Sequence, residues 1–229
     1  MQGLVIVTGG SKGIGLAISS KFLEEGYKVI SISRTKGDTD ELKQRFADNF
    51  ILMFGDLTSK SDILRMTKEI SETYKDIDVL VNNAGTFIPG QIQEEADGVF
   101  ELMLSLNLAA AYHTTRALLP AMYNRNAYIF NICSTASIMP YINGGSYCIS
   151  KHALLGFSRV LRKELTGKGV NVSAILPGAT KTESWDGTDL PDSRFIKPSS
   201  IADTIFLAWT NKDNCVMEEI LIRPVLGDI

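Results

Sequence analysis

Short, continuously apolar runs alternate along the chain with longer segments in which apolar positions recur every three or four residues. The short runs are rich in β-branched residues and predict strands, whereas the longer spacing predicts helices. Strands are expected at 4–8, 27–33, 50–54, 77–81, 128–133, 170–176 and 218–223. Helices are expected from a glycine-rich turn to about residue 25, then at 40–48, 60–74, 96–122 (as two helices), 146–166 and 200–209.

Helical crossovers between successive strands predict a parallel sheet that is covered by helices on both faces. The run at 4–8 is almost entirely apolar, as expected for a strand that is buried on both sides. No linker, repeat or low-complexity segment divides the sequence. We therefore expect residues 1–229 to form a single α/β domain, a doubly wound parallel sheet of about seven strands. Ligands of such sheets bind beyond the carboxyl ends of the strands.

Composition excludes several classes of protein. The 229 residues include 23 Lys and Arg against 26 Asp and Glu, and 45% are hydrophobic, which is ordinary for a globular domain and argues against disorder. The nearly balanced charge argues against binding of nucleic acid through a basic surface. No apolar run approaches the roughly 20 residues that span a bilayer, and no basic segment precedes the first strand. Neither a membrane partner nor a signal peptide is expected.

Cysteine and histidine are too few and too dispersed for a metal site. Cys133, Cys148 and Cys215 are an odd number and form no CxxC pair, and His113 and His152 are 39 residues apart. This pattern predicts neither a disulfide framework nor a bound metal. The simplest compartment is the cytoplasm.

A glycine-rich turn follows the first strand and opens the first helix. It has the sequence Thr8-Gly9-Gly10-Ser11-Lys12-Gly13-Ile14-Gly15. Gly9 allows a tight turn, Gly13 allows backbone to approach a pyrophosphate, and Gly15 allows close packing of helix and strand. The helix N-terminus adds N–H donors and positive dipole. A plain strand–helix turn is the alternative interpretation of this segment.

Several motifs in order resemble the short-chain dehydrogenase/reductase family over nearly the whole chain. They are the TGxxxGxG spacing of the glycine turn, Asn82-Asn83-Ala84-Gly85, the pair Tyr147-x-x-x-Lys151, and Pro177-Gly178. The resemblance implies a Rossmann-type fold, a nicotinamide cofactor, and interconversion of a carbonyl and an alcohol by hydride transfer. The expected substrate is a small carbonyl compound.

The end of the second expected strand favours NADP(H) as the cofactor. An NAD site usually has an acidic residue there, but Ser33 stands at this place and Arg34 follows it. Together with Lys12 in the glycine turn, Arg34 would suit a 2′-phosphate. In the family, bases at these two positions accompany preference for NADP(H). The alternative is two solvated surface cations.

The resemblance implies a set of cofactor-binding residues in the loops after the strands. Asp56 would hold the adenine, although it could also be an ordinary loop acid, and the Asn82–Gly85 motif is partly structural. The segment Pro177–Thr182 would contact the nicotinamide carboxamide. The full set is Gly9, Ser11, Lys12, Gly13, Ile14, Gly15, Ser33, Arg34, Asp56, Leu57, Asn83, Ala84, Gly85, Tyr147, Lys151, Pro177, Gly178, Thr180 and Thr182.

The candidate catalytic residues are Ser134, Tyr147, Lys151 and Asn107. Tyr147 and Lys151 lie four apart in a helical pattern and therefore share a face. A phenol with an ordinary pKa of about 10 is a poor acid or base near pH 7, and a nearby ammonium would lower that pKa. The resemblance assigns Tyr147 as general acid/base, Lys151 as a ribose ligand that tunes it, and Ser134 as a donor to the carbonyl oxygen. It assigns Asn107 to a water relay that leads to Lys151.

The substrate is expected to lie against residues 136–145 and the polar segment 179–197, a plausible lid. Candidate substrate residues are Ser134, Tyr141, Tyr147 and Trp185. Cys133 and Cys148 adjoin two of them, but hydride transfer needs no thiol, so we interpret both as packing residues. The long apolar helix at 102–119 is expected to be covered on both sides. In the family this helix packs against a second subunit, which predicts a homodimer or homotetramer.

The tail at 218–229 resembles that of bacterial sepiapterin-reductase-like members of the family, which suggests a pterin or dicarbonyl substrate. A 3-oxoacyl-[acyl-carrier-protein] reductase is the main alternative. It would need a basic patch for an acidic carrier, for which the candidates are Arg116, Arg125, Arg159, Arg162 and Lys163. A cofactor-binding regulatory or scaffold protein without turnover is the alternative outside enzymes.

Overall fold

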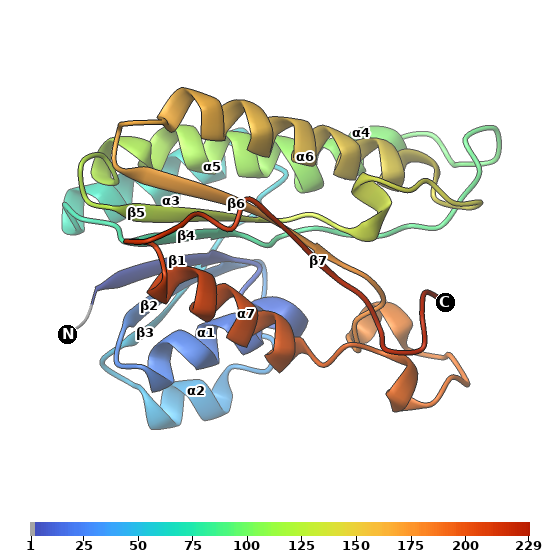
Figure 1. The fold of residues 1–229 in the computed structure, drawn as a ribbon, viewed down its shortest axis with the longest axis horizontal. Helices are drawn as coiled ribbons and strands as arrows, with labels where there is room; N and C mark the ends of the chain where they lie inside the picture. The colour runs from blue at the N-terminus through green and yellow to red at the C-terminus, as the bar shows by residue number, and fades with distance from the viewer. Residues whose placement is uncertain (1–2) are drawn as a thin grey trace.

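A seven-stranded parallel sheet forms the centre of the computed structural model, which describes residues 3–229. The strand order is β3-β2-β1-β4-β5-β6-β7 (Figure 1). The strands are β1 (Leu4–Thr8), β2 (Lys28–Ser33), β3 (Phe50–Phe54), β4 (Val79–Asn82), β5 (Ala127–Ile132), β6 (Val170–Pro177) and β7 (Glu219–Ile222). The order reverses direction between β1 and β4, which confirms the doubly wound fold.

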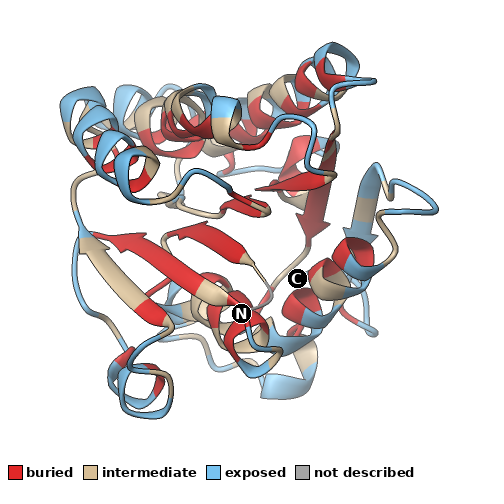
Figure 2. Ribbon diagram, turned by 90° about the vertical axis from the view of Figure 1, so that its left-hand side faces the viewer, coloured by how far each residue is buried: buried red, intermediate tan, exposed pale blue. Residues whose placement is uncertain are grey.

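Helices cover both faces of this sheet (Figure 1). One layer contains α1 (Gly13–Glu24), α2 (Asp40–Arg45) and α7 (Pro198–Thr210), and the other contains α3 (Lys60–Thr73), α4 (Val99–Leu104), α5 (Ala110–Leu118) and α6 (Gly145–Leu165). Residues that face the sheet are buried, and those on the outer faces are exposed (Figure 2). The protein therefore has two main apolar clusters, one on each face of the sheet. Successive side chains of a strand point alternately into one cluster and the other.

The region expected to hold two helices at 96–122 contains α4 and α5, which follow one another in a continuous helical run. A π-helical segment, Ser105–Ala109, joins α4 to α5 without a loop, and a short 3-10 turn, Leu119–Ala121, ends the run. A π segment adds a residue to one turn, which displaces the side chains that follow. The expectation of two helices is confirmed, whereas the π-helical junction between them was not predicted, and Asn107 lies at its centre.

Ser59 caps the N-terminus of α3. The amide of Asp62 donates to the Ser59 hydroxyl at 3.3 Å. The Asp62 carboxylate accepts from the backbone N–H of Asp56 at 2.9 Å. The cap therefore also fixes the loop after β3, at the carboxyl edge of the sheet.

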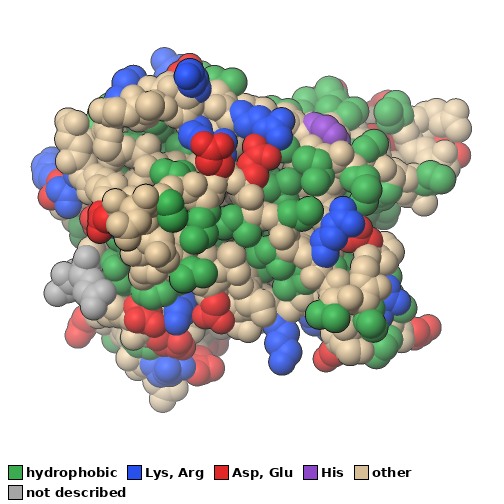
Figure 3. Space-filling model, viewed as in Figure 1, with side chains coloured by type: hydrophobic (Ala, Val, Ile, Leu, Met, Phe, Trp, Pro, Cys, Tyr) green, Lys and Arg blue, Asp and Glu red, His purple; other side chains and the backbone are tan. Residues whose placement is uncertain are grey.

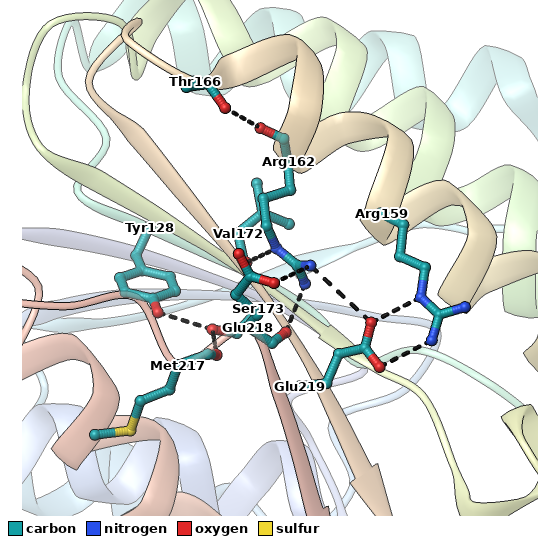
Figure 4. Close-up of polar contacts among 9 residues, drawn as sticks. All are labelled: Tyr128, Arg159, Arg162, Thr166, Val172, Ser173, Met217, Glu218 and Glu219. Carbon is teal, nitrogen blue, oxygen red and sulfur yellow. Dashed lines mark hydrogen bonds and ion pairs between the residues drawn. The ribbon is translucent and has the colours of Figure 1, made fainter.

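Two arginines of α6 hold the edge strand β7 (Figure 4). Arg162 donates to the carbonyls of Val172 and Glu218 and to the Glu218 carboxylate. Arg159 forms a bidentate pair with Glu219, at 2.7 and 2.9 Å. The Arg162 side chain is 16% exposed and that of Arg159 is 56% exposed, so the first is the stronger attachment.

Within residues 3–229, every helix is too short or too polar to span a bilayer.

Replacement of Arg162 should destabilise the fold far more than replacement of Arg159. Arg162→Met removes the arginine's hydrogen bonds to two backbone carbonyls, of which that of Glu218 keeps the amide of Ala174, and we expect it to lower the free energy of unfolding by about 1–3 kcal/mol. Arg159→Met removes an exposed pair and should cost much less. Urea denaturation of both variants measures the difference. Equal losses would contradict the assigned role of Arg162.

Candidate active site

The glycine turn between β1 and α1 has a backbone that neighbouring segments and a ligand can approach closely. Gly9 and Gly13 have positive φ, at 66° and 52°. A Cβ on Gly15 would lie 2.2 Å from the Gly9 carbonyl oxygen and 2.4 Å from Nδ2 of Asn83, so only glycine fits there. The first turn of α1 has no acidic residue and no side-chain cap. Its N–H groups are thus open to an anion, which fits a bound pyrophosphate.

The Asn83-Ala84 segment after β4 is tied to this turn. The Thr8 hydroxyl accepts from the amides of Asn83 and Ala84, at 3.0 and 3.1 Å. The side-chain amide of Asn83 donates to the carbonyls of Thr8 and Gly9. This part of the motif therefore has a structural role, and it aligns two loops that face the same cavity.

A cavity of about 540 Å³ opens at the carboxyl edge of the sheet. The glycine turn and the 83–87 segment line one side of it, and Ser134, Tyr147 and Lys151 line another. The 179–185 segment covers part of the opening. A single cavity thus combines an anion-binding turn with a phenol, an ammonium and a hydroxyl.

Most of the predicted site residues line this cavity. Those that do are Gly9, Lys12, Gly13, Ile14, Asn83, Ala84, Gly85, Ser134, Tyr141, Tyr147, Lys151, Pro177, Gly178, Thr180, Thr182 and Trp185. Those outside its lining are Ser11, Gly15, Ser33, Arg34, Asp56, Leu57 and Asn107. Of these, Gly15 and Asn107 act through packing and hydrogen bonds, and the rest lie at or near the ends of β1, β2 and β3.

Comparison with known proteins agrees with this arrangement. A model of the short chain dehydrogenase family matches residues 3–190. The chain belongs to the short-chain dehydrogenase family. Sepiapterin reductase of Chlorobaculum tepidum is 30% identical, with 100% of this chain and 99% of that protein covered. The NADP-dependent 3-hydroxy acid dehydrogenase YdfG of Escherichia coli is 34% identical over 84% of this chain and 76% of its own.

Solved structures agree with the family assignment. The closed form of a serine dehydrogenase complexed with NADP+ superposes with a TM-score of 0.88 at 28% identity, with 99% of this chain and 96% of that one covered. The family resemblance of the sequence is therefore confirmed, and the chain is an oxidoreductase of this family.

Lys151 is the most deeply buried charged group of the site. Its side chain leaves α6 and donates from Nζ to the carbonyl oxygen of Ile132, the last residue of β5, at 2.8 Å. Nζ lies 5.8 Å from the centre of the Tyr147 ring. Burial lowers the pKa of Lys151 to about 8.

The pKa of the Tyr147 phenol is raised, whereas the sequence led us to expect a lowered value. Burial raises its pKa, and the nearby Ser134 hydroxyl opposes the increase. Desolvation outweighs the favourable contact because the phenolate would be almost enclosed by protein. Ser134 is fixed in turn, because its hydroxyl accepts from the amide of Ala136 and its own amide donates to Ser137.

Asn107 holds two segments of the site together from the π-helical turn. Its amide nitrogen donates to the Thr86 carbonyl and to the Ser150 hydroxyl, and its oxygen accepts from the Thr86 amide at 2.8 Å. A Cβ on Gly85 would lie 3.1 Å from the Asn107 oxygen and 3.4 Å from Lys151 Nζ. The side chain is thus occupied with positioning, and the water relay remains a prediction.

The residues expected at the cofactor phosphate differ in their surroundings. The Ser33 hydroxyl is buried and has no hydrogen-bond partner among residues 3–229, and Arg34 is exposed beside it. Lys12 is exposed and paired with Glu183 of the lid segment at 2.6 Å. Hydrogen bonds from Thr58 lower the pKa of Asp56, and the charge of Arg34 adds to this effect.

Phe87 and Asp228 are among the cavity residues that were not predicted. The Phe87 ring packs edge-on against Tyr147 with centres 4.9 Å apart. Asp228 also lines the cavity, and its carboxylate pairs with Arg223 at 3.0 Å. Met139, which lies in the expected substrate wall 136–145, also lines the cavity. The Phe87–Tyr147 contact joins residues 60 positions apart, so it has no local sequence signal.

Within residues 3–229, no cluster of three or more His, Cys, Asp or Glu side chains is arranged to hold a metal ion. Cys133 lies in the cavity wall, and burial raises its pKa to about 11. A thiol that is protonated at neutral pH is a poor nucleophile.

The buried ammonium predicts a pH dependence of stability. In the unfolded chain a lysine keeps its proton to about pH 10.5, whereas folded Lys151 loses it near pH 8. The unfolded state therefore binds more protons between these values, and stability should rise with pH there. Relative to Lys151→Met, the free energy of unfolding should increase by about 2 kcal/mol from pH 8 to pH 10. Urea denaturation at each pH measures it, and a flat difference would contradict the burial of the ammonium.

Proposed function

We propose that the protein is an NADP(H)-dependent oxidoreductase that interconverts a small carbonyl compound and an alcohol by hydride transfer, with Tyr147 as general acid/base. The observation that carries the proposal is the cavity that Tyr147, Ser134 and Lys151 share with the glycine turn. The bound cofactor supplies or accepts the hydride. The chain's own groups then bind the carbonyl oxygen and move one proton.

Tyr147 and Ser134 suit the two tasks at the carbonyl oxygen. The raised pKa of Tyr147 keeps its phenol protonated near pH 7, so it holds the proton that a developing alkoxide needs. Ser134, which lines the same cavity, donates to the same oxygen and fixes its position. Tyr147 accepts the proton again when the alcohol is oxidised.

Lys151 supplies positive charge close to the Tyr147 ring. With a pKa of about 8 it is mostly protonated at pH 7, and the Ile132 carbonyl fixes its position. The ammonium favours the phenolate that forms when Tyr147 gives up its proton. We also assign it to the ribose of the cofactor, with Asn107 holding the adjacent segment.

The preference for NADP(H) is supported by charge. Arg34 and Lys12, both exposed, flank the region where the 2′-phosphate would lie and can pair with it. The relative YdfG and the complexed serine dehydrogenase are both described with NADP.

The substrate wall favours a planar or apolar carbonyl compound. Phe87, Met139, Tyr141 and Trp185 line the cavity. We propose a sepiapterin-like or dicarbonyl substrate, in agreement with the 30% identity to a sepiapterin reductase. The role in acyl-carrier reduction is less well supported, because Arg159 and Arg162 are paired with Glu219 and Glu218 and Arg125 with Asp76.

We propose a homodimer or homotetramer in the cytoplasm. Hydrophobic side chains gather on the face that carries α6 and β7 (Figure 3). Ile149, Val160 and Leu221 are exposed on these elements, as are Phe100 and Tyr112 on α4 and α5. Apolar exposure of this extent is typical of surfaces that pack against another subunit. The three cysteines are all free, as in a reducing compartment.

Tyr147→Phe should abolish turnover and leave cofactor binding nearly intact. Loss of the proton donor should lower kcat by about 10²- to 10⁴-fold. Tyr141→Phe is the matched control, since it removes another hydroxyl from the cavity wall and should retain kcat within a few fold. Oxidation of NADPH against a panel of dicarbonyls, pterins and 3-oxoacyl thioesters measures the rate, and quenching of NADPH fluorescence measures binding. Full activity of Tyr147→Phe would refute the mechanism.

Arg34→Asp should shift preference towards NADH. A charge-assisted hydrogen bond contributes about 1.5–3 kcal/mol, so the ratio of kcat/KM for NADPH over NADH should fall roughly 10- to 100-fold. Lys43→Asp, an equal change of charge on the exposed face of α2, is the control and should leave the ratio unchanged. If Arg34→Asp keeps the original ratio, Arg34 does not contact the phosphate.

A further inference from the structure

Helix α6 begins without a cap of its own. Gly144 precedes the helix and has no side chain to accept a hydrogen bond, and the first turn contains no acidic residue. The first N–H groups of a helix need acceptors from elsewhere. Because Tyr147 lies in this first turn, whatever holds the turn also fixes the direction of the Tyr147 side chain.

Glu95 supplies the missing acceptor from the segment between β4 and α4. Its Oε1 accepts from the backbone amide of Ser146 at 2.8 Å, and its Oε2 accepts from the Ser146 hydroxyl. Ser146 is buried and directly precedes Tyr147. A carboxylate here satisfies an orphan donor and also interacts favourably with the positive end of the helix dipole.

Two glycines make room for this carboxylate. A Cβ on Gly145 would lie 2.2 Å from Oε1 of Glu95, and one on Gly90 would lie 2.7 Å from Cγ of Glu95. The Gly90 amide also donates to the Asn143 carbonyl at 3.0 Å. The chain therefore approaches itself closely at this point, in a geometry that only the bare backbone at both positions allows.

The same segment touches the phenol ring itself. Phe87 packs against Tyr147, and Thr86 is hydrogen-bonded on both its amide and its carbonyl by Asn107. Residues 86–95 thus contact the Tyr147 ring through Phe87 and the preceding residue, Ser146, through Glu95. Glu95 makes its contact through hydrogen bonds to the helix start.

We propose that Glu95 is a positioning residue for the reaction, which fixes the first turn of α6 and thereby the Tyr147 hydroxyl. The expected effect of Glu95 on the reaction rate rests on the proposed function, whereas its effect on the helix start does not. The placement of the helix start is a property of the fold, and it can be measured without any substrate.

Hydrogen exchange followed by mass spectrometry tests the placement. Glu95→Ala should speed amide exchange in residues 145–149 by tenfold or more, with little change in the β-sheet. Glu95→Gln should remain close to the parent protein, because its side-chain oxygen can accept from the Ser146 amide and its nitrogen can donate to the Ser146 hydroxyl. Glu94→Ala, which removes an exposed neighbour, is the matched control and should change nothing.

Steady-state kinetics on the best substrate of the carbonyl panel tests the consequence. Per NADPH-binding site, Glu95→Ala should lower kcat about tenfold while the KM for the carbonyl and the affinity for NADPH stay within about twofold. Glu95→Gln should recover most of kcat. A merely structural role would lower the melting temperature and leave kcat per binding site unchanged.

Each other outcome overturns the proposal. Unchanged exchange at 145–149 in Glu95→Ala, kcat within twofold of the parent, or a Gln variant as slow as the Ala variant would each do so. Should Glu95→Ala fail to fold, Ser146→Ala removes one of the two hydrogen bonds and should give a smaller increase in exchange at the same residues. Absence of turnover in the parent protein would refute the proposed function, while the exchange result would still decide the placement.

Discussion

The site depends on one buried hydrogen bond, from the ammonium of Lys151 to the carbonyl of Ile132. A lysine that is only 5% exposed is unfavourable unless it is paired, and here a single backbone oxygen at the end of β5 receives it. The bond can form only if α6 packs on the sheet with Lys151 next to the carboxyl end of β5. The strand order and the length of the loop before α6 are therefore linked to the chemistry, since an error in either would leave the ammonium or the carbonyl without a partner.

The second requirement is that backbone segments around the cavity pack closely together. Glycine residues make this possible. Gly15 brings α1 against the turn that follows β1, Gly85 lies beside Asn107 and Lys151, and Gly145 admits the Glu95 carboxylate to the start of α6. None of the three contributes a functional group. Each removes a side chain that would separate two groups which must lie within hydrogen-bond distance.

Much of the fold follows from the sequence because buried parallel strands are continuous apolar runs that can be recognised locally. The predicted strand at 128–133, for example, lies within one residue of Ala127–Ile132. The π-helical segment at Asn107 was missed because one extra residue in a turn leaves the apolar pattern of a helix nearly unchanged. The motif residues came together in one cavity because each follows a strand, and the carboxyl ends of parallel strands share an edge. Glu95, Phe87 and Asp228 could not be found in this way, because their contacts join segments far apart in the chain and depend on how loops pack.

The walls of the cavity differ in how firmly they are held. Tyr147, Ser134 and Lys151 are fixed by the helix start, by the turn after β5 and by a buried bond, so their mutual geometry changes only if the core changes. The 179–197 segment is attached to the glycine turn by the exposed pair Lys12–Glu183, and solvent screens such a pair strongly. An anionic ligand at the glycine turn would attract Lys12 and repel Glu183, which weakens this attachment as the ligand arrives. Phe195 and Ile196 are buried and hold the other end of this segment. A rigid set of reacting groups beside a segment whose Glu183 end is held by an exposed pair is the arrangement that admits a charged cofactor without disturbing the atoms that move the proton.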